Sequence, residues 1–292
     1  MADLQHEREL PGGQDAAGLP QLNRVETQAR IDFDTSIPHT ARMYDYFLGG
    51  KDNFAADRAA ARAVLEAMPE LPLSLRLNRQ FLRSAVRWTA NRGIRQYLDI
   101  GTGIPTAGNT HETAQAIAPD ACVAYVDNDP IVLTHARALM AGHGLGRTTF
   151  TRADLREPKA ILSAPEVREV IDFRQPVALM LVAILHFIRD EERPYDIVSQ
   201  LVEALPSGSY LILSHASPDA DPERAAKASQ GWRTASAQMT MRPHRDVLRF
   251  FDGLELVEPG LVTRWNPDGD DEDSVPELGE RVMGYGGVAR KP

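Results

Sequence analysis

The segment YLDIGTGIPT, residues 97–106, is the clearest structural signal in the chain, because an apolar strand pattern runs into a short turn with two glycines. Gly101 and Gly103 can adopt positive φ angles and let a ligand approach the backbone closely. A helix that begins after such a turn offers backbone N–H groups that have no partner within the helix. On its own, the pattern fits a nucleotide site and a tight strand-to-helix turn equally well.

Around this segment, short apolar stretches alternate with helical patterns from residue 95 onward. Strands are expected at 96–100, 122–127, 148–152, 177–184, 209–215, 254–257 and 281–289. Helical periodicity favours helices at 106–117, 130–140, 193–205 and 221–241. Strands that alternate with helices predict a parallel sheet covered on both faces. We therefore expect a seven-stranded, mostly parallel, doubly wound α/β sheet.

The N-terminal part of the chain is organised differently. Residues 1–30 are polar, contain Pro-Gly-Gly at 11–13 and show no sustained periodicity, which predicts a flexible tail. Helical patterns follow at 55–68 and 75–92, which end at Pro69 and Gly93 respectively. We therefore divide the chain into a tail (1–30), a helical cap (31–94) and an α/β domain (95–292), with the cap packed on the domain as one unit.

The charge balance of the 292 residues limits the possible partners. The 32 basic and 41 acidic side chains give a formal net charge of −9, so no general positive field exists to bind nucleic acid or an anionic membrane. Seven of the acidic residues lie between Asp268 and Glu280 with no Lys or Arg among them. This run indicates a solvated acidic loop on a nearly neutral body.

Cysteine content and hydropathy indicate the compartment. The single cysteine, Cys122, excludes an internal disulfide and a multi-cysteine metal site, as is typical of a reducing cytoplasm. The longest uninterrupted apolar run, 177–185, is shorter than the ~20 residues of a membrane helix. The N-terminal segment also lacks the hydrophobic core of a signal peptide. We expect a cytoplasmic protein with neither a membrane nor a nucleic-acid partner.

Polar residues follow the ends of the later strands in the same order. Asp127 ends the second strand, Asp154 follows the third and His186 follows the fourth. Open α/β sheets bind ligands beyond the C-terminal ends of their strands, and an acid after the second strand can accept hydrogen bonds from ribose hydroxyls. Each acid alone is more often a loop residue or a helix cap. Their ordered placement after the glycine turn makes a nucleotide site the better interpretation.

The turn distinguishes between nucleotide cofactors. A nicotinamide fingerprint needs a third glycine where this sequence has Thr106, and no phosphate-binding G-x-x-x-x-G-K-[ST] is present. After the Gly-Gly-Lys of 49–51, Asp52 replaces the Ser or Thr that would hold magnesium. Asp99 is a poor neighbour for a pyrophosphate but suits an ammonium group. S-adenosylmethionine has an ammonium, a ribose and an adenine, and it has no phosphate.

The sequence resembles the class I S-adenosylmethionine-dependent methyltransferases, and more closely an actinobacterial family of S-adenosyl methyltransferases, over about residues 31–290. The matching segments are PHTARMYDYFLGGKDNFAADR (38–58), LDIGTGIPTAGNTHE (98–112), VAYVDNDPIVLTHARALM (123–140) and TRADLRE (151–157). The first segment identifies the family and the others the superfamily. Pro105 stands where the superfamily turn has its third glycine. The resemblance implies a Rossmann-like methyltransferase fold with S-adenosyl-L-methionine as cofactor.

The resemblance also implies roles for single residues at the strand ends. Asp99 would hold the methionine ammonium, Asp127 the ribose hydroxyls and Asp154 the adenine amino group. The backbone floor and the surroundings of the adenine would be formed by Gly101, Thr102, Gly103, Asn128 and Leu155.

The segment 42–58 is expected to fold over the cofactor. Candidates for the methionine end or the substrate pocket in this segment are Tyr44, Asp45, Gly49 and Lys51. The helix 221–241 is a candidate substrate lid, although ordinary packing explains it equally well. His186 is a candidate proton acceptor near the methyl group, or only a polar residue at the strand end. The sequence HETAQ, 111–115, lacks the second histidine of a zinc-protease helix, so no metal site is expected.

These observations favour a methyltransferase that acts on a small molecule. No Asn/Asp-Pro-Pro-aromatic tetrapeptide follows the fourth strand, where residues 183–187 read AILHF. This absence weakens DNA or amide-nitrogen methylation, and it leaves open a catalytically silent S-adenosylmethionine-binding protein that regulates a partner. An NAD(P)-dependent oxidoreductase is disfavoured by Thr106 and by the long stretch before the first strand. The identity of the acceptor and the oligomeric state do not follow from the sequence.

Overall fold

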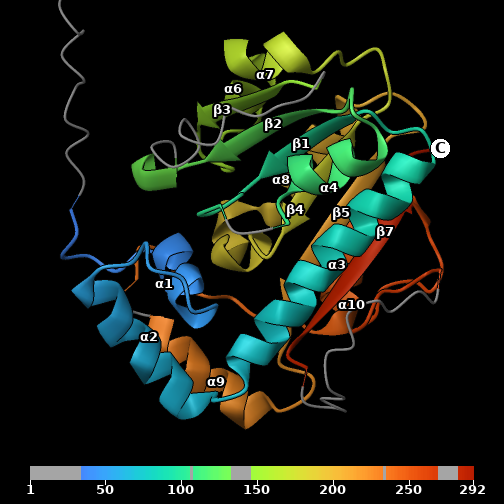
Figure 1. Ribbon diagram of the computed structural model, residues 1–292. Helices are drawn as coiled ribbons and strands as arrows, with labels where there is room; N and C mark the ends of the chain where they lie inside the picture. The colour runs from blue at the N-terminus through green and yellow to red at the C-terminus, as the bar shows by residue number, and fades with distance from the viewer. Residues whose placement is uncertain (1–33, 106–107, 133–145, 233–234, 269–281) are drawn as a thin grey trace, which may run out of the picture. The chain divides into compact units, whose positions relative to one another are not determined.

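A seven-stranded sheet forms the centre of the unit made by residues 33–292, with strand order β3-β2-β1-β4-β5-β7-β6 (Figure 1). The structure, a computed structural model, describes residues 34–105, 108–132, 146–232, 235–268 and 282–292. The strands are β1 (Gln96–Ile100), β2 (Cys122–Asp127), β3 (Thr148–Arg152), β4 (Ala178–Val182), β5 (Tyr210–Ala216), β6 (Glu255–Leu256) and β7 (Gly284–Arg290).

The register of the sheet brings the candidate residues to one edge. β1 pairs in parallel with β2 and β4, so that Asp99 lies opposite Tyr125 on one side and Met180 on the other. β3 and β5 continue the parallel arrangement, whereas β7 is antiparallel to both β5 and β6. The strand order reverses between β1 and β4, and such a switch point is where open α/β sheets bind ligands.

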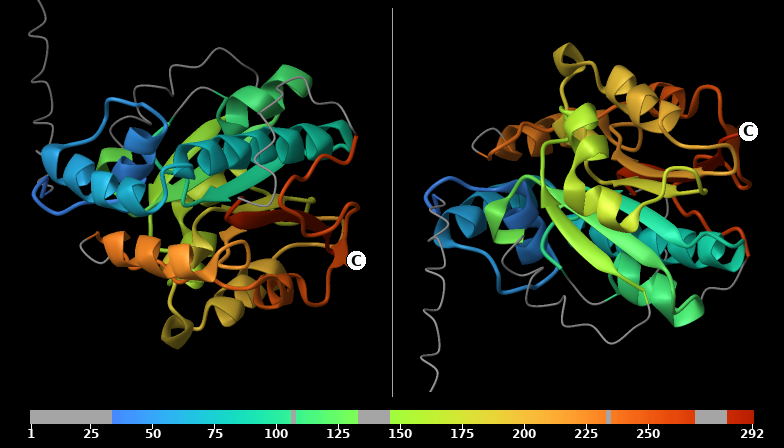
Figure 2. Two further views of the ribbon diagram at one scale, coloured as in Figure 1. Left: turned by 90° about the horizontal axis from the view of Figure 1, so that it is seen from below. Right: turned by 90° about the horizontal axis from the view of Figure 1, so that it is seen from above.

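Helices cover both faces of the sheet (Figure 2). One face is covered by α3 (Leu71–Asn91) and α4 (Thr110–Ile117), around a buried cluster that includes Tyr97 and Met180. The other cluster includes Leu98 and Leu179, because neighbouring strand residues point to opposite faces. Its helices are α6 (Pro158–Ser163), α7 (Pro165–Val170), α8 (Pro194–Glu203) and α10 (His244–Leu248).

A third buried cluster joins the N-terminal helices to a late one. α1 (Thr40–Phe47) and α2 (Ala55–Ala67) pack with α9 (Pro222–Gly231), and Figure 1 shows α2 beside α9. Met43 and Val64 are fully buried in this cluster, and the rings of Phe47 and Trp232 lie 5.9 Å apart. The helices that precede the sheet in the sequence therefore have an apolar core of their own.

The predicted fold is confirmed, with differences in single elements. β1, β2 and β3 have the expected bounds. The helix expected from residue 106 begins at Thr110, where the side chains of Asn109 and Glu112 cap its first turn. The helix expected at 221–241 is shorter, since α9 ends at Gly231. Most of three expected segments, at 1–30, 130–140 and 268–280, lies outside the described residues.

Two short helices, α6 and α7, were not expected from the sequence. Each has six residues and begins with a proline. Proline suits the first turn of a helix, whose N–H groups lack partners. Six residues are too few to show helical periodicity. None of the helices in the described ranges is both long and apolar enough to cross a membrane.

Candidate functional site

The C-terminal edge of β1 and β2 lines a cavity that we call the strand-end cavity. Its volume is about 730 Å³, including the open space at its mouth. Its lining includes the turn after β1 and the acidic residues of two strand ends. From the predicted site it contains Tyr44, Asp99, Gly101, Thr102, Gly103, Asp127 and Asn128.

Asp99 is the innermost carboxylate of this cavity. Its side chain accepts a 2.7 Å hydrogen bond from the hydroxyl of Thr110, and the residue is only 4% exposed. Burial raises the pKa of Asp99 to about 6, although the Thr110 hydrogen bond and the charge of Arg79 oppose this shift. A buried carboxylate of this kind gains from a cationic ligand, because the ligand compensates its lost hydration.

Asp127 is held by backbone groups on both of its oxygens. Oδ2 accepts a 2.8 Å hydrogen bond from the N–H of Gly103, and Oδ1 accepts one of 2.9 Å from the N–H of Asp129. These bonds fix the carboxylate against the glycine turn, and each oxygen keeps a second lone pair for a ligand. Burial raises the pKa of Asp127.

The glycine turn has the conformation that its residues allow. Gly101 and Gly103 have φ angles of +77° and +66°. A Cβ atom on Gly101 would lie 2.5 Å from the side chain of Ile184, so the space beside this glycine admits no side chain. The turn therefore presents bare backbone to the cavity.

A second cavity, the β3 cavity, adjoins the strand-end cavity and has a volume of about 530 Å³. Asp154 and Leu155 line it, and Gly101, Asp127 and Asn128 line both cavities. Leu155 is buried, whereas the Asp154 side chain is 35% exposed and pairs with Arg156 at 3.1 Å. The three acids thus line two adjoining cavities, with Asp99 in the first, Asp154 in the second and Asp127 in both.

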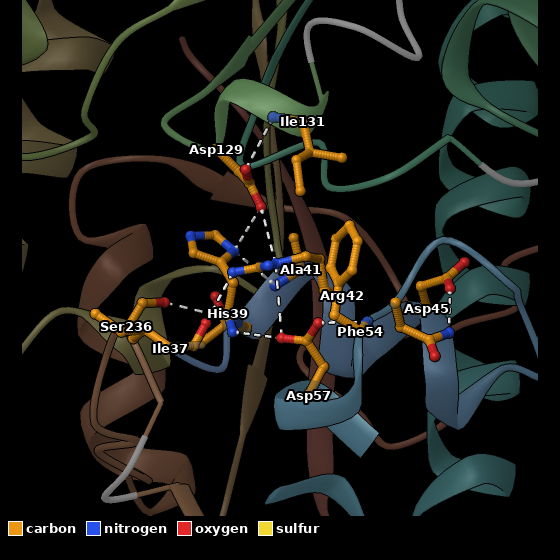
Figure 3. A network of polar contacts seen from close by, with 12 residues as sticks. Ile37, His39, Ala41, Arg42, Asp45, Phe54, Asp57, Asp129, Ile131 and Ser236 are labelled. Carbon is orange, nitrogen blue, oxygen red and sulfur yellow. Dashed lines mark hydrogen bonds and ion pairs between the residues drawn. The ribbon is translucent and has the colours of Figure 1, made fainter. Parts of the chain in front are cut away.

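A buried polar network fixes α1 beside these cavities (Figure 3). Nδ1 of His39 lies 3.0 Å from Oδ2 of Asp129, the second residue after β2. Arg42 contacts both Asp129 at 3.7 Å and Asp57 of α2 at 3.6 Å. Asp57 is fully buried and accepts hydrogen bonds from the backbone N–H groups of His39 and Phe54.

This network also controls the charge of Asp129. Burial alone would raise its pKa, but the contacts with His39 and the charge of Arg42 lower it. Because Asp57 and Asp129 share the one guanidinium of Arg42, removal of Arg42 would leave two buried carboxylates without this cation. The network therefore joins the N-terminal cap to the loop that follows β2.

Of the candidates in segment 42–58, the structure brings only Tyr44 to the cavities. Asp45 is buried, and its Oδ2 accepts hydrogen bonds from the Asp52 N–H and the Asn53 side chain. Gly49, with φ of +81°, and Lys51 are exposed. None of these three lines either cavity described above. Asp45 instead orders the loop between α1 and α2.

His186 lies in the short turn Leu185–Phe187 after β4 and lines a third cavity, not the strand-end cavity. Its Nδ1 accepts a 3.3 Å hydrogen bond from the N–H of Ala216. Burial, together with the charge of Arg242, lowers its pKa to about 3, so the ring is neutral at pH 7. With Nδ1 accepting, the proton is on Nε2, and the ring presents a donor there. To accept a proton at Nδ1, His186 would have to release Ala216.

Sequence reasoning did not identify two polar residues of α3 that line the strand-end cavity, Asn78 and Arg79. Arg79 donates a 2.9 Å hydrogen bond to the carbonyl of Gly108 and provides positive charge near Asp99. A signal was present: Leu77, Phe81 and Leu82 form the apolar stripe of this helix, and residues 78 and 79 flank it. Within the described ranges, no cluster of three His, Cys, Asp or Glu residues is placed to bind a metal ion.

Comparisons with known proteins agree with this geometry. A family model described as S-adenosyl methyltransferase matches residues 26–292. A crystal structure of a DUF574 family protein from Streptomyces avermitilis is 46% identical, with a TM-score of 0.84, and the match covers 89% of this chain and 99% of that chain. A candidate methyltransferase from Thermobifida fusca is 40% identical, with a TM-score of 0.80 and coverage of 92% and 99%.

A more distant structure shows likeness of the fold alone. An O-methyltransferase family protein from Burkholderia thailandensis is 14% identical, with a TM-score of 0.50, and the match covers 88% of this chain and 64% of that chain. No curated protein matches the sequence. The family match spans nearly the whole described unit, and the chain therefore belongs to the family of S-adenosyl methyltransferases.

Proposed function

We propose that this S-adenosylmethionine-dependent methyltransferase methylates a small molecule and holds its cofactor along the strand-end and β3 cavities. The observation that supports this most directly is the pair of adjoining cavities lined by Asp99, Asp127 and Asp154. A single ligand with an ammonium, a ribose and an amino-bearing base presents its donors in that order.

The residues present fit the cofactor. Asp99 is a buried carboxylate suited to the ammonium, and Arg79 in the same lining suits the methionine carboxylate. Asp127, held by two backbone N–H groups, has lone pairs left for ribose hydroxyls. The turn at Gly101 leaves no room for a side chain, which suits a ligand that lies against the backbone.

The protein's part in the reaction is mainly positioning. When bound, the cofactor supplies a methyl group activated by a positively charged sulfur. Phe187 lines all three cavities and is placed to exclude water where they meet. Tyr44 and Asn78 line the junction with the third cavity and are placed to orient the acceptor. His186 enters this scheme as a neutral hydrogen-bond donor.

Two further expectations belong to this proposal. The single cysteine and the acidic balance support a cytoplasmic protein without a nucleic-acid partner. The relatives from Streptomyces avermitilis and Thermobifida fusca are in keeping with an actinobacterial family.

Calorimetric titration with S-adenosylhomocysteine and with NAD⁺ tests the proposed site. We expect S-adenosylhomocysteine to bind and NAD⁺ not to bind. Asp127→Ala should weaken S-adenosylhomocysteine binding by about 1.5–3 kcal/mol, as expected for lost hydrogen bonds to a charged group. The matched control is Asp252→Ala at an exposed position outside the cavities, which should leave the affinity unchanged. Equal affinities of the Asp127→Ala and wild-type proteins would remove Asp127 from the site.

A further inference from the structure

The third cavity adjoins the strand-end cavity and differs from it in character. We call it the apolar cavity; its volume is about 860 Å³, including its opening. It lies between the N-terminal helices, α9 and the strands β5 and β7, and it shares Tyr44, Asn78, Ala183 and Phe187 with the strand-end cavity. A molecule in it would therefore reach the space that the proposed function gives to the cofactor.

The lining of the apolar cavity is mainly hydrophobic, with uncharged polar side chains such as Ser74 and Thr263. The side chains include Met68, Leu75, Trp232, Met239 and Met283. Among the lining residues that the structure describes, none is Asp, Glu, Lys or Arg. A charged ligand would lose its hydration here without gaining a partner of opposite charge.

The two histidines of the lining do not supply charge. Burial lowers the pKa of His186 to about 3, and burial lowers the pKa of His215 well below its ordinary value. His215 donates from Nδ1 to the carbonyl of Ala216 at 2.7 Å and accepts at Nε2 from Arg242 at 3.0 Å. Both rings are therefore neutral at pH 7.

The polar groups at the junction with the strand-end cavity form one directed chain. The N–H of Ala183 donates to Ser214 Oγ at 3.0 Å, and the Ser214 hydroxyl donates to Asn78 Oδ1 at 2.6 Å. The Asn78 amide then donates to Tyr44 Oη at 3.1 Å. Because every bond in the chain has a fixed direction, the hydroxyl proton of Tyr44 stays available for a further acceptor at the junction.

We propose that the apolar cavity binds the methyl acceptor and selects an uncharged, mainly hydrophobic small molecule, whose one polar group accepts a hydrogen bond from Tyr44. This inference rests on the proposed function. It adds the class of substrate: the absence of charged side chains from the described lining disfavours anions and cations.

Three probes that share the naphthalene ring system and differ in charge test the inference. The full chain, saturated with S-adenosylhomocysteine, is titrated with 1-naphthol, 1-naphthoate and 1-naphthylmethylammonium. We expect 1-naphthol to bind at least about tenfold more tightly than either charged probe. A charged probe would lose the hydration of its charge in the cavity and gain no partner of opposite charge. Tyr44→Phe should weaken 1-naphthol binding severalfold through loss of one hydrogen bond.

Single substitutions test whether 1-naphthol binds in the apolar cavity. Leu75→Asp introduces a charge into the lining and should weaken 1-naphthol binding at least about tenfold while S-adenosylhomocysteine still binds. Leu248→Asp makes the same change at a 39% exposed position outside the lining and should have no effect. If Leu75→Asp does not fold, Met239→Asp makes the same test from a loop of the lining.

The outcomes separate the two proposals. Failure of the wild-type protein to bind S-adenosylhomocysteine contradicts the proposed cofactor site. If S-adenosylhomocysteine binds normally, three results would overturn the inference alone. They are equal affinity for the three probes, no binding of 1-naphthol, and unchanged 1-naphthol binding in Leu75→Asp.

Discussion

Asp99 shows how the site uses a residue that destabilises the fold. A carboxylate with its pKa raised to about 6 by burial costs free energy when it ionises at pH 7. The Thr110 hydrogen bond offsets only part of this cost. The cost is regained when a cation binds, so Asp99 links the affinity for the proposed cofactor to protonation.

This linkage predicts a pH dependence of binding. Because the folded pKa is about 6, Asp99 is ionised at pH 7.5 and mostly protonated at pH 5.0. The affinity for S-adenosylhomocysteine should therefore fall about tenfold between these pH values, as a proton competes with the ammonium group. Calorimetric titration with S-adenosylhomocysteine at both pH values measures this change in affinity.

Asp99→Asn provides the comparison for this experiment. The variant should bind weakly at both pH values and keep only the pH dependence that Asp127, with its own raised pKa, contributes. An equal pH dependence in the variant and the wild-type protein would contradict the role of Asp99.

The lowered pKa of His186 predicts how the free energy of unfolding depends on pH. Its folded pKa of about 3 lies below the ordinary 6.5, so between these values the unfolded chain binds a proton that the folded chain does not. Folding stability contributed by the neutral ring is therefore lost as the pH falls below 6.5. Relative to His186→Asn, the wild-type free energy of unfolding should drop by about 2 kcal/mol between pH 7.5 and 5.0.

Urea unfolding of both proteins at the two pH values measures this difference. Asn can keep the acceptor for the Ala216 N–H at a similar place, so the comparison isolates titration of the ring. Parallel pH curves for the two proteins would mean that the pKa of His186 in the folded state is close to its ordinary 6.5, which would restore it as a candidate general base.

At the residue scale, the sequence predicted which acids lie at the C-terminal edge of the sheet, and all three line cavities there. Asp99, Asp127 and Asp154 have fixed places because strand ends are set by local patterns. Asp45, a candidate for the methionine end or the substrate pocket, lines neither cavity; its partners Asp52 and Asn53 could not be predicted, because they depend on the course of a loop. The roles of the predicted site residues stay predictions until a ligand complex is measured.

At the scale of elements, the position of α1 depends on the buried pairs of His39 and Arg42 with Asp129. Asp129→Ala leaves Arg42 paired only with Asp57 and removes the oxygen that accepts from the Ile131 N–H. We expect a loss of about 1–3 kcal/mol in the free energy of unfolding and faster amide exchange in α1.

The control for this prediction is Asp120→Ala. Its side chain is 65% exposed and pairs with Arg95, so the change should cost less than about 0.5 kcal/mol. Because Asp129 lines neither the strand-end nor the β3 cavity, weaker S-adenosylhomocysteine binding in Asp129→Ala would act indirectly, through α1 or through the loop after β2 that holds Asp127. Unchanged exchange in α1 would show that apolar packing alone holds this helix.

Strands were easier to predict than helices for a physical reason. Runs such as VALMLVAI have no polar alternation because β4 is covered on both faces. α7 packs on β2 and β3, and α6 packs on α7 and α8; each has six residues, too few for a periodic signal. Helix ends were predicted less well: α4 begins four residues later than expected and α9 ends ten residues earlier, because helix ends depend on capping and on neighbouring segments.

At the scale of the whole molecule, three cavities follow one another along the C-terminal edge of the sheet and share Phe187. The apolar cavity could not be predicted, because it is assembled from segments far apart in the sequence, such as Leu75, Trp232 and Met283. No local pattern distinguishes a side chain that lines such a cavity from one that fills a core.

The division of the chain gives a prediction at the same scale. Residues 1–30 show no apolar periodicity, and the family match begins only at residue 26. Deletion of 1–30 should therefore leave the melting temperature and the affinity for S-adenosylhomocysteine unchanged. Deletion of 1–58 removes α1 and should abolish binding. A large loss in the shorter deletion would make the N-terminal segment a structural part of the enzyme.

A crystal structure of the protein with S-adenosylhomocysteine bound tests the central claim most directly. We expect the ammonium group within hydrogen-bond distance of Asp99, the ribose hydroxyls on Asp127 and the adenine beside Asp154 and Leu155. The sulfur should face the junction at Tyr44 and Phe187. A ligand that binds elsewhere, or in the reverse direction with its adenine in the apolar cavity, would contradict it.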